Sequence, residues 1–404
     1  MRKRILLLSQ WFEPEPIFKG LLFARELVQR GFAVEVVTGF PNYPTGKLYP
    51  GYSMSWRHRE VIDGVEITRL PLYPSHDASA PRRIATYASF ALSALVYCAF
   101  QAKRPDVVYV YQLPTLGFVA GLIKALRGSA FVFDIQDIWP DTLRATGMVG
   151  REGVLRAVDR ALKWVYRRAD KVVVLSPGFR RLLLDRGVPP GKIELIYNWS
   201  PETSLAAPRE VEVAGFPADG RFRILFAGNM GKAQALDAVL EAAARLESQC
   251  PRIQLVFIGG GVETDRLKAV ARDRPLSNVT FLPRVGMDQI GGVLQKAHAL
   301  LIHVKADPLF TITIPGKTQA YMAIGKPILA AVRGDAADLG RQAQCGLEAT
   351  PEDAASIANA ATALASLPPG ELEAMGQRGK AYYAANLSVA VGVDRFASVF
   401  DNVR

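Results

Sequence analysis

Cysteine and histidine are scarce in this sequence of 404 residues, which contains three cysteines and four histidines. Cys98, Cys250 and Cys345 lie far apart and are odd in number, so they provide neither a disulfide framework nor a zinc-binding pattern. This use of cysteine is typical of a reducing compartment, and we expect a cytoplasmic location. The first apolar run, Ile5–Leu8, is too short for the core of a secretory signal and predicts a first strand instead.

Several patterns that mark nucleotide and metal sites are also missing. No G-x-G-x-x-G follows the first predicted strand and no G-x-x-x-x-G-K-[ST] occurs, which argues against a nicotinamide dinucleotide site and a P-loop. The sequence has no D-x-D pair and no histidine or cysteine spacing suited to a metal, and we interpret His298 and His303 as packed side chains. We therefore expect no metal and no cofactor.

Composition and charge limit the class of protein and its partners. Half of the residues are hydrophobic and 22% are charged, which excludes a disordered or collagen-like chain, and the length suits two domains. The net charge of +11 lies entirely in the first half, because residues 1–200 hold 28 Lys and Arg against 17 Asp and Glu, whereas the remaining residues hold 21 of each sign. The first half is therefore expected to meet an anionic partner. No basic motif interleaved with aromatics supports nucleic acid.

Short β-branched runs alternate with helical stretches along the whole chain, which predicts parallel sheets covered by helices on both faces. We expect two Rossmann-like, doubly wound α/β domains, residues 1–200 and 201–385, that face a central cleft and bind ligands at the carboxyl ends of their strands. Residues 386–404 predict a helix that either completes the second domain or crosses back to the first. The predicted strands are Ile5–Gln10, Ala33–Gly39, Asp106–Tyr111, Phe131–Ile135, Lys171–Ser176, Arg223–Ala227, Gln254–Ile258, Val279–Leu282, Ala299–Val304 and Pro327–Ala331.

Three loops of the second half combine glycine with polar side chains beside a predicted strand or helix. Thr313–Gln319 opens a helix, and its proline and glycine set a turn whose N–H groups, with a lysine and a hydroxyl, suit a diphosphate. Ala227–Lys232 and Ile258–Glu263 follow strands and allow close backbone approach to a ligand. Taken alone, each loop is also compatible with an ordinary turn or a proline-led helix start. The candidates for donor binding are Gly228, Asn229, Lys232, Gly260, Pro315, Gly316, Lys317, Thr318 and Gln319.

The first half offers a glycine loop and a carboxylate cluster. Gly20 stands between the first strand and a helix, where N–H groups can approach a phosphate and Lys19 could add charge. Asp134, Asp137 and Asp141 lie at the end of a predicted strand and are candidates for binding sugar hydroxyls or for general-base work, with capping and turn formation as the alternative. Asp137 is the preferred functional residue.

Residues 84–102 contain no charge and are flanked by basic residues. Their length reaches the lower part of the transmembrane range. Polar residues interrupt the segment, however, and it occupies a helix position of the alternating pattern, so we favour a buried or half-buried helix. The alternative is a helix with one face in a bilayer. The flanking residues, which we expect to meet membrane or acceptor, are Arg82, Arg83, Lys103 and Arg104.

Taken together, these motifs resemble the family-4 glycosyltransferases, retaining enzymes of the GT-B fold, over essentially the whole chain. The branch that the sequence resembles contains N-acetyl-L-fucosamine transferases of O-antigen assembly and related exopolysaccharide enzymes. The segments that carry this resemblance are Pro41–Gly46, Gln136–Asp141, Tyr197–Trp199, Ala227–Gly231 and Thr313–Ala323.

The resemblance implies a metal-independent hexosyltransferase that takes a nucleotide sugar, UDP-linked by analogy with the branch, into its second domain and an acceptor into its first. Gly20 would approach the donor phosphates, Asp137 would lie near the transferred sugar, and Arg284 and Val285 would flank the base. Lys317 would sit by the diphosphate and, with Asp137, carry the catalysis.

Two departures from the family pattern affect the catalytic assignment. The family's Glu-x7-Glu pair would fall at Ile312 and Ala320, and its usual arginine and lysine after the first strand of the second domain are Asn229 and Gln234 here. Lys317, with a possible contribution from Lys232, would then supply the positive charge, stabilising the leaving diphosphate together with fixed N–H groups.

The basic first half fits an acceptor carried on a polyprenyl diphosphate, with the protein in the cytoplasm and peripherally attached to the inner face of the cell membrane. Two alternatives stay open. One is a GT-B nucleotide-sugar epimerase that needs no acceptor, and the other is a non-catalytic nucleotide-sugar-binding subunit.

Overall fold

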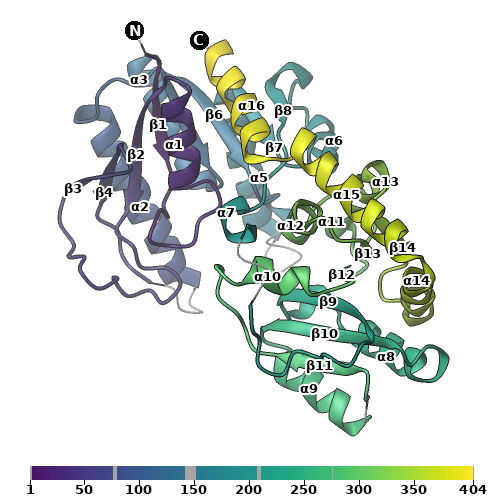
Figure 1. Ribbon diagram of the computed structural model, residues 1–404. Coiled ribbons are helices and arrows are strands. Elements are labelled where there is room, and N and C mark those ends of the chain that lie inside the picture. Colours follow the sequence, from purple (N-terminus) through teal and green to yellow (C-terminus); the bar gives the residue numbers. More distant parts are fainter. Residues whose placement is uncertain (1, 76–79, 142–151, 207–210, 275, 404) are drawn as a thin grey trace. The chain divides into compact units, whose positions relative to one another are not determined.

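The computed structural model describes residues 2–75, 80–141, 152–206, 211–274 and 276–403. The chain forms two compact units, each built on its own β-sheet (Figure 1). Residues 1–196 and 393–404 make up the first unit, and residues 197–392 make up the second.

The centre of the first unit is an eight-stranded sheet in the order β3-β4-β2-β1-β5-β6-β7-β8. Neighbouring strands run parallel except β3 and β4, which form an antiparallel hairpin at one edge. All residues of β5 and β6 are buried, as a parallel sheet between two helical layers requires. The strands are β1 (Arg4–Leu8), β2 (Ala33–Gly39), β3 (His58–Ile62), β4 (Val65–Leu70), β5 (Val107–Tyr111), β6 (Ala130–Ile135), β7 (Lys171–Val174) and β8 (Ile193–Leu195).

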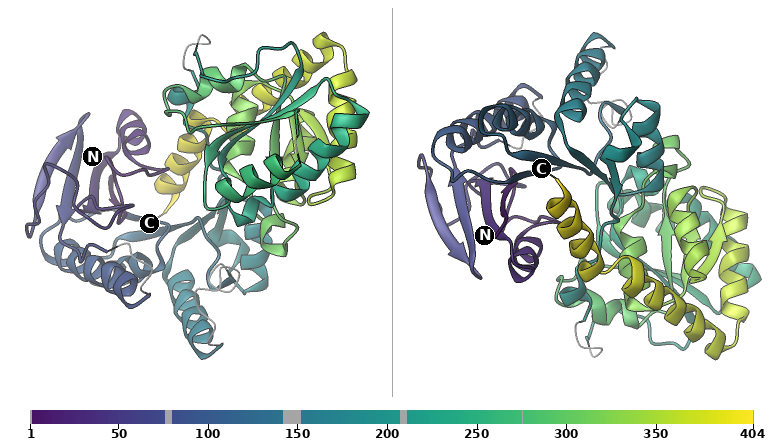
Figure 2. Two further views of the ribbon diagram at one scale, coloured as in Figure 1. Left: turned by 90° about the horizontal axis from the view of Figure 1, so that it is seen from below. Right: turned by 90° about the horizontal axis from the view of Figure 1, so that it is seen from above.

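Helices lie on both faces of this sheet, as Figure 2 shows. Their ends carry the expected signals: Ser176 accepts a hydrogen bond from the backbone N–H of Phe179 at the start of α6, and α3 ends at Gly128 with a φ of 68°. The helices are α1 (Leu21–Gln29), α2 (Ala80–Phe100), α3 (Pro114–Arg127), α5 (Glu152–Arg168), α6 (Pro177–Asp185) and the short η1 (Pro190–Lys192).

The second unit contains a six-stranded parallel sheet in the order β11-β10-β9-β12-β13-β14. Alternate strand residues face two apolar layers, one packed against α8 and α14 and the other against α12 and α13. The strands are β9 (Phe222–Asn229), β10 (Ile253–Gly260), β11 (Val279–Leu282), β12 (Ala299–His303), β13 (Ile328–Ala331) and β14 (Gly346–Ala349). The helices are α7 (Glu202–Leu205), η2 (Lys232–Gln234), α8 (Asp237–Gln249), α9 (Thr264–Asp273), α10 (Ile290–Gln295), α11 (Pro308–Thr311), α12 (Gly316–Ile324), α13 (Asp335–Ala343), α14 (Ala354–Ser366) and α15 (Pro369–Asn386), and α16 (Val389–Asn402) begins in this unit.

The prediction of two Rossmann-like α/β domains is confirmed, and every strand predicted from the sequence is present. Four strands were missed: β3, β4, β8 and β14. β3 is a mostly exposed edge strand with charged residues, and β8 and β14 are only three and four residues long, so none of these three shows a strong apolar run.

The C-terminal helix α16 begins in the second unit and ends as part of the first. Phe396 and Phe400 are fully buried, and their ring centroids lie 5.6 and 5.7 Å from the centroid of the Tyr109 ring. Of the two arrangements left open by the sequence, the last residues thus complete the core of the first unit.

Lys19 is not available to a phosphate, contrary to the role considered from the sequence. Its side chain is fully buried and its Nζ lies 2.5 Å from Oδ2 of Asp134, which also accepts a hydrogen bond from the hydroxyl of Tyr109. The Nζ lies 4.8 Å from the ring centroid of Phe396. Because a buried charge is tolerated only when it is paired, Lys19 and Asp134 are structural partners in the core of this unit.

Among the described residues, one helix is long and apolar enough to cross a membrane, the stretch Pro81–Phe100 of α2. One side of α2 belongs to the core, with Phe90, Ala94 and Tyr97 almost fully buried. The Tyr97 hydroxyl donates a hydrogen bond of 2.7 Å to Glu35 on β2. The helix is therefore half-buried, in agreement with the favoured expectation of a buried or half-buried helix.

Candidate functional site

The carboxyl ends of β9 and β10 lie side by side in the second unit and carry two glycines with positive φ. Gly228 pairs with Gly259 in the strand register, with φ values of 125° and 135°. A Cβ atom at Gly259 would lie 2.1 Å from the carbonyl oxygen of Gly228, so only glycine allows this close approach of the two strands. The two glycines leave backbone, not side chains, exposed at this edge of the sheet.

Helix α12 is held against the same edge. Its Tyr321 is 1% exposed, and the Tyr321 hydroxyl accepts a hydrogen bond of 3.0 Å from the backbone N–H of Ala227 at the end of β9. The helix follows Pro315, which occupies the N-cap position. No described residue provides a hydrogen-bond acceptor for the backbone N–H groups of Gly316 and Lys317. These amides are therefore available to an anion at the helix N-terminus.

A cavity of about 420 Å³ opens between these elements. Of the residues proposed from the sequence to bind the donor, six line it: Gly228, Asn229, Arg284, Val285, Gly316 and Lys317. The structure thus brings together residues from three separate loops, as the arrangement of parallel strands predicts. The rest of the lining is mainly apolar and consists of Pro201, Leu205, Ala227, Ile258, Gly259, Met287, Ile290, Leu294, Ala320 and Tyr321.

Lys317 is the half-buried cation of this cavity. Its Nζ lies 3.5 Å from the ring centroid of Phe226, a cation–π contact, and no carboxylate among the described residues pairs with it. Desolvation without a compensating anion lowers the pKa of Lys317 to about 7. The side chain passes over Gly228, where a Cβ would lie 2.9 Å from Lys317 Cε. The lysine is thus positioned without an anionic partner from its own chain.

Two neutral side chains stand where the resembled family has an arginine and a lysine. The Asn229 amide donates to Gln234 Oε1 at 3.4 Å, and the backbone N–H of Gly231 donates to the same oxygen at 3.0 Å. This pair shapes the loop after β9 but brings no positive charge. Arg284, which is exposed, is the second cation in the lining.

Five other predicted donor-binding residues do not line this cavity. Lys232 is exposed on η2, Gly260 is the last residue of β10, and Pro315 is the N-cap residue of α12. Thr318 and Gln319 are buried on α12, and the side chain of Thr318 lines a different cavity. Their assignment to donor binding remains a prediction.

Of the three clustered carboxylates, Asp137 is the one that forms no ion pair within the described residues, so it is the candidate for a catalytic role. Asp134 is paired with Lys19, and Asp141 forms an ion pair with Arg186. Asp137 follows β6 and its side chain reaches the surface of the first unit. The surrounding protein still desolvates this carboxylate and raises the pKa of Asp137 above its usual value.

Gly20 caps α1, and the first amide of that helix already has a partner. The backbone N–H of Leu21 donates to Oε1 of Glu13 at 2.9 Å, and a Cβ at Gly20 would lie 2.3 Å from the same oxygen. Glycine is required here to seat the chain's own carboxylate. The expected approach of Gly20 to donor phosphates stays a prediction.

The histidines proposed as packed side chains have structural partners. His298 Nδ1 accepts a hydrogen bond from the backbone N–H of Arg223 at 3.0 Å. His303 Nε2 accepts from the backbone N–H of Glu352 at 3.0 Å, so its Nδ1 carries the proton and donates to the carbonyl of Gln234 at 2.6 Å. Across the described parts of the chain, no group of three His, Cys, Asp or Glu side chains is arranged to hold a metal ion.

Sequence reasoning missed several residues of the cavity. Tyr321 stands four residues after Lys317 on α12, so helical periodicity could have placed it on the same face. Three consecutive glycines gave no basis for preferring Gly259 over Gly260. Pro201 and Leu205 come from the link between the domains, and no local pattern connects them with the other lining residues.

Comparison with known protein families gives two matches, one in each half of the chain. Residues 21–199 match the family "Glycosyl transferase 4-like domain", and residues 221–366 match "Glycosyl transferases group 1". Among curated proteins, the chain is similar to WcaI of Escherichia coli (strain K12), whose name assigns it to colanic acid biosynthesis as a glycosyl transferase. The identity is 27% over 310 residues, which are 74% of this chain and 75% of WcaI.

Solved structures share the fold over nearly the full length. Sucrose-phosphate synthase from Thermosynechococcus elongatus superposes with a TM-score of 0.72 at 19% identity, covering 99% of this chain and 98% of the other. HepE from Anabaena, solved in complex with UDP, has a TM-score of 0.69 at 15% identity, covering 99% and 100%.

The two glycines at the end of β10, Gly259 and Gly260, allow a matched test of the site's backbone. We expect Gly259→Ala to lower the thermal denaturation midpoint clearly, because a Cβ there meets the Gly228 carbonyl and φ is 135°. A positive φ in this region costs about 1–3 kcal/mol for a residue with a side chain, before the clash is counted. Gly260→Ala meets no atom within 4 Å and should leave the midpoint nearly unchanged. Equal effects of the two substitutions, measured by circular dichroism, would contradict this description.

Proposed function

Because the chain joins a glycosyl transferase 4-like domain to a group 1 glycosyltransferase domain, we propose that it transfers a sugar from a UDP-sugar to a lipid-linked glycan in the synthesis of a cell-surface polysaccharide. The matches to two glycosyltransferase families and the similarity to WcaI support a role as a transferase of polysaccharide biosynthesis. UDP is supported by the fold shared with HepE, which was solved with this nucleotide.

The observation that carries the proposal is Lys317 without an anionic partner, placed beside the N-terminus of α12 in the 420 Å³ cavity. A diphosphate brings the negative charge that this site lacks. Helix amides and a desolvated ammonium are a recurrent means of binding phosphate. Gly228 and Gly259 allow the backbone of β9 and β10 to approach the ligand.

The proposed chemistry is electrostatic. Departure of UDP builds negative charge on its outer phosphate, and a protonated Lys317 with the amides of Gly316 and Lys317 would stabilise that charge. The diphosphate raises the pKa of Lys317 when it binds, so the lysine takes up a proton and becomes the cation that the departure needs. Asp137 would serve as the polar group beside the transferred sugar. We assign retention of configuration by the family resemblance.

For the donor sugar we propose an N-acetylated deoxyamino sugar. This finer assignment depends on the motifs that resemble the branch of N-acetyl-L-fucosamine transferases, Pro41–Gly46 and Gln136–Asp141 among them. Val285 and Arg284 would hold the base, since they line the cavity from the loop after β11.

The exposed face of helix α2 supports the proposal that the acceptor is membrane-bound. The side chains at positions 84, 88, 92, 96 and 100, spaced by four residues along the helix, are all apolar. Ile84, Leu92 and Phe100 among them are 66%, 63% and 83% exposed. An apolar stripe of this kind on a helix flanked by Arg83, Lys103 and other basic residues suits the surface of an anionic bilayer. We propose that α2 rests in the inner face of the cell membrane, where a polyprenyl-diphosphate acceptor is present.

Binding of UDP should depend on Lys317 and on pH. With a pKa of about 7 in the unliganded protein, Lys317 is protonated below pH 7 and neutral above it. Because UDP binds the cation, its affinity should fall between pH 7.5 and 9, and binding at pH 8 should take up close to one proton. Titration calorimetry in buffers of different ionisation enthalpy measures both quantities.

Lys317→Met should weaken UDP binding by about 10- to 100-fold at pH 7, the range for losing a charged hydrogen bond, and abolish the proton uptake. Lys268→Met is the matched control, since Lys268 is exposed on α9 outside the cavity, and it should behave as wild type. An unchanged affinity in Lys317→Met would remove the diphosphate assignment.

Transfer is distinguished from epimerisation by the need for an acceptor. With radiolabelled UDP-N-acetyl sugars, we expect label to enter the lipid phase only when polyprenyl-diphosphate glycans are present. Asp137→Asn should lower that rate by about 100-fold or more while UDP affinity is kept, because the carboxylate acts on the sugar and not on the nucleotide. Conversion of the donor to its epimer without any acceptor would establish the alternative activity.

Membrane contact can be tested on exposed positions that leave the core intact. We expect sedimentation of the protein with phosphatidylglycerol vesicles at low salt, and a loss of most of this binding in Leu92→Glu/Phe100→Glu. Val61→Glu changes an equally exposed apolar residue on β3 (68% exposed) and should bind as wild type. If the double variant still sediments fully, α2 is not the contact.

A further inference from the structure

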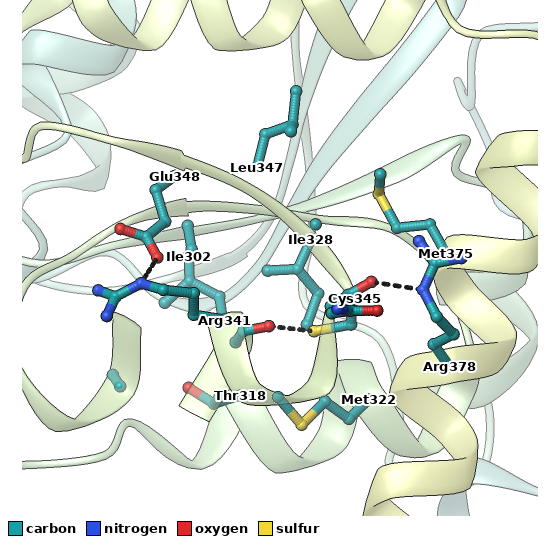
Figure 3. A pocket seen from close by; sticks show the side chains of 15 residues that line it. Ile302, Thr318, Met322, Ile328, Arg341, Cys345, Leu347, Glu348, Met375 and Arg378 are labelled. Carbon is teal, nitrogen blue, oxygen red and sulfur yellow. Dashed lines mark hydrogen bonds and ion pairs between the residues drawn. The ribbon is translucent and has the colours of Figure 1, made fainter. Parts of the chain in front are cut away.

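A second cavity, of about 350 Å³, lies in the second unit and is distinct from the donor cavity. Figure 3 shows the side chains around it, which come from α12, α13, α15 and the strands β12, β13 and β14. Its volume falls in the range of cavities that hold small ligands. No residue of this cavity also lines the donor cavity.

Most of the wall is apolar and well packed. Met322 and Ile328 are 0% and 2% exposed, and Ala336 and Met375 also lie below a tenth exposed. Cys345 belongs to the wall as a thiol, because burial raises the pKa of Cys345 to about 11. An occupant would therefore bury a hydrocarbon body against this wall, and burial of apolar surface would favour its binding.

Five polar side chains also line the cavity: Thr318, Arg341, Gln344, Glu348 and Arg378. Thr318 is 2% exposed, and its hydroxyl has no hydrogen-bond partner among the described residues. Arg378, which is exposed on α15, donates through Nε to the carbonyl of Gln344 at 3.0 Å (Figure 3), and its two terminal nitrogens have no partner in the described chain. Arg341 is already paired, with Glu348 at 2.9 Å. With Arg341 and Glu348 paired to each other, the polar lining offers the Thr318 hydroxyl, the Gln344 amide and the Arg378 guanidinium.

From this geometry we propose that the second cavity is a binding site for a small organic anion with an apolar body, such as a medium-chain carboxylate. The hydrocarbon part packs on Met322, Ile328 and Met375, and the anionic group reaches the terminal nitrogens of Arg378. The Thr318 hydroxyl, which costs free energy while buried without a partner, gains one from the ligand.

The position of the cavity also couples it to the donor site. Lys317 and Thr318 are consecutive residues of α12, yet Lys317 lines the donor cavity and Thr318 lines the second one. An occupant that holds Thr318 and Met322 therefore acts on the helix that carries Lys317. This coupling, but not the binding itself, rests on the proposed donor function. The ligand would be an effector of nucleotide affinity.

A substitution at Gly340 tests whether a ligand occupies the second cavity. Gly340 lines the cavity from α13, and a Cβ added there meets no heavy atom within 4 Å. Gly340→Leu should therefore extend a side chain into the cavity, and leucine is favoured over glycine in a helix. Gly370→Leu on α15 is the matched control, because it also meets no atom and does not line the cavity.

Octanoate is the probe, with octan-1-ol as its uncharged counterpart, and binding is measured by titration calorimetry without nucleotide. We expect octanoate to bind wild type and Gly370→Leu but not Gly340→Leu. Arg378→Gln should weaken octanoate by about tenfold and leave octan-1-ol unchanged. Equal octanoate binding in wild type and Gly340→Leu, as association with the exposed face of α2 would give, overturns the site. Absence of octanoate binding to wild type also overturns the site. Equal affinities of wild type for octanoate and octan-1-ol overturn the assignment of an anion.

The coupling is measured separately as the dissociation constant of UDP with and without saturating octanoate. We expect a change of about threefold or more in wild type and none in Gly340→Leu. No change in wild type overturns the coupling while the site stands. If UDP fails to bind wild type at all, the proposed donor function is wrong, whereas octanoate binding still decides the second site.

Discussion

The structure of the second unit depends on one unusual electrostatic arrangement, a lysine held over an aromatic ring without a carboxylate from its own chain. Burial of a cation costs free energy that a counter-ion normally offsets. For Lys317 the Phe226 ring at 3.5 Å provides only part of that compensation, and the pKa of Lys317 falls to about 7 as a result. The folded chain thus maintains a site whose missing component is negative charge, and an anionic ligand supplies it.

The backbone around Lys317 is built to keep that arrangement. Gly228 leaves room for the aliphatic part of the lysine, and Gly259 lets β10 come close to Gly228. Tyr321 ties the same helix to the end of β9 through its hydroxyl. Each of these contacts restricts where the N-terminus of α12 can lie. The cation is therefore preorganised by the fold, which is what electrostatic stabilisation of a leaving group requires.

The sequence predicted the two sheets well because strands buried on both faces give continuous apolar runs such as Val107–Tyr111. It also predicted that the loops after β9 and before α12 would meet, since strand ends of a parallel sheet share one edge. The place of Arg284 and Val285 beside them was expected from the family resemblance. It could not decide which way neighbouring helix residues point, so Thr318 was grouped with Lys317 although it faces another cavity. Edge and short strands such as β3 and β8 carried too little apolar pattern to be recognised.

Lys19 and Lys317 show why a lysine in a loop cannot be assigned from its neighbours alone. Lys19 precedes α1 and Lys317 lies in the first turn of α12, and both were candidates for binding phosphate. Lys19 meets Asp134, a residue 115 positions away, and this pair is satisfied inside the first unit. Lys317 meets no such carboxylate in the described chain. The distinction between a structural and a functional cation is thus set by a tertiary counter-ion, and a desolvated lysine that lacks one is the stronger candidate for binding an anion from outside.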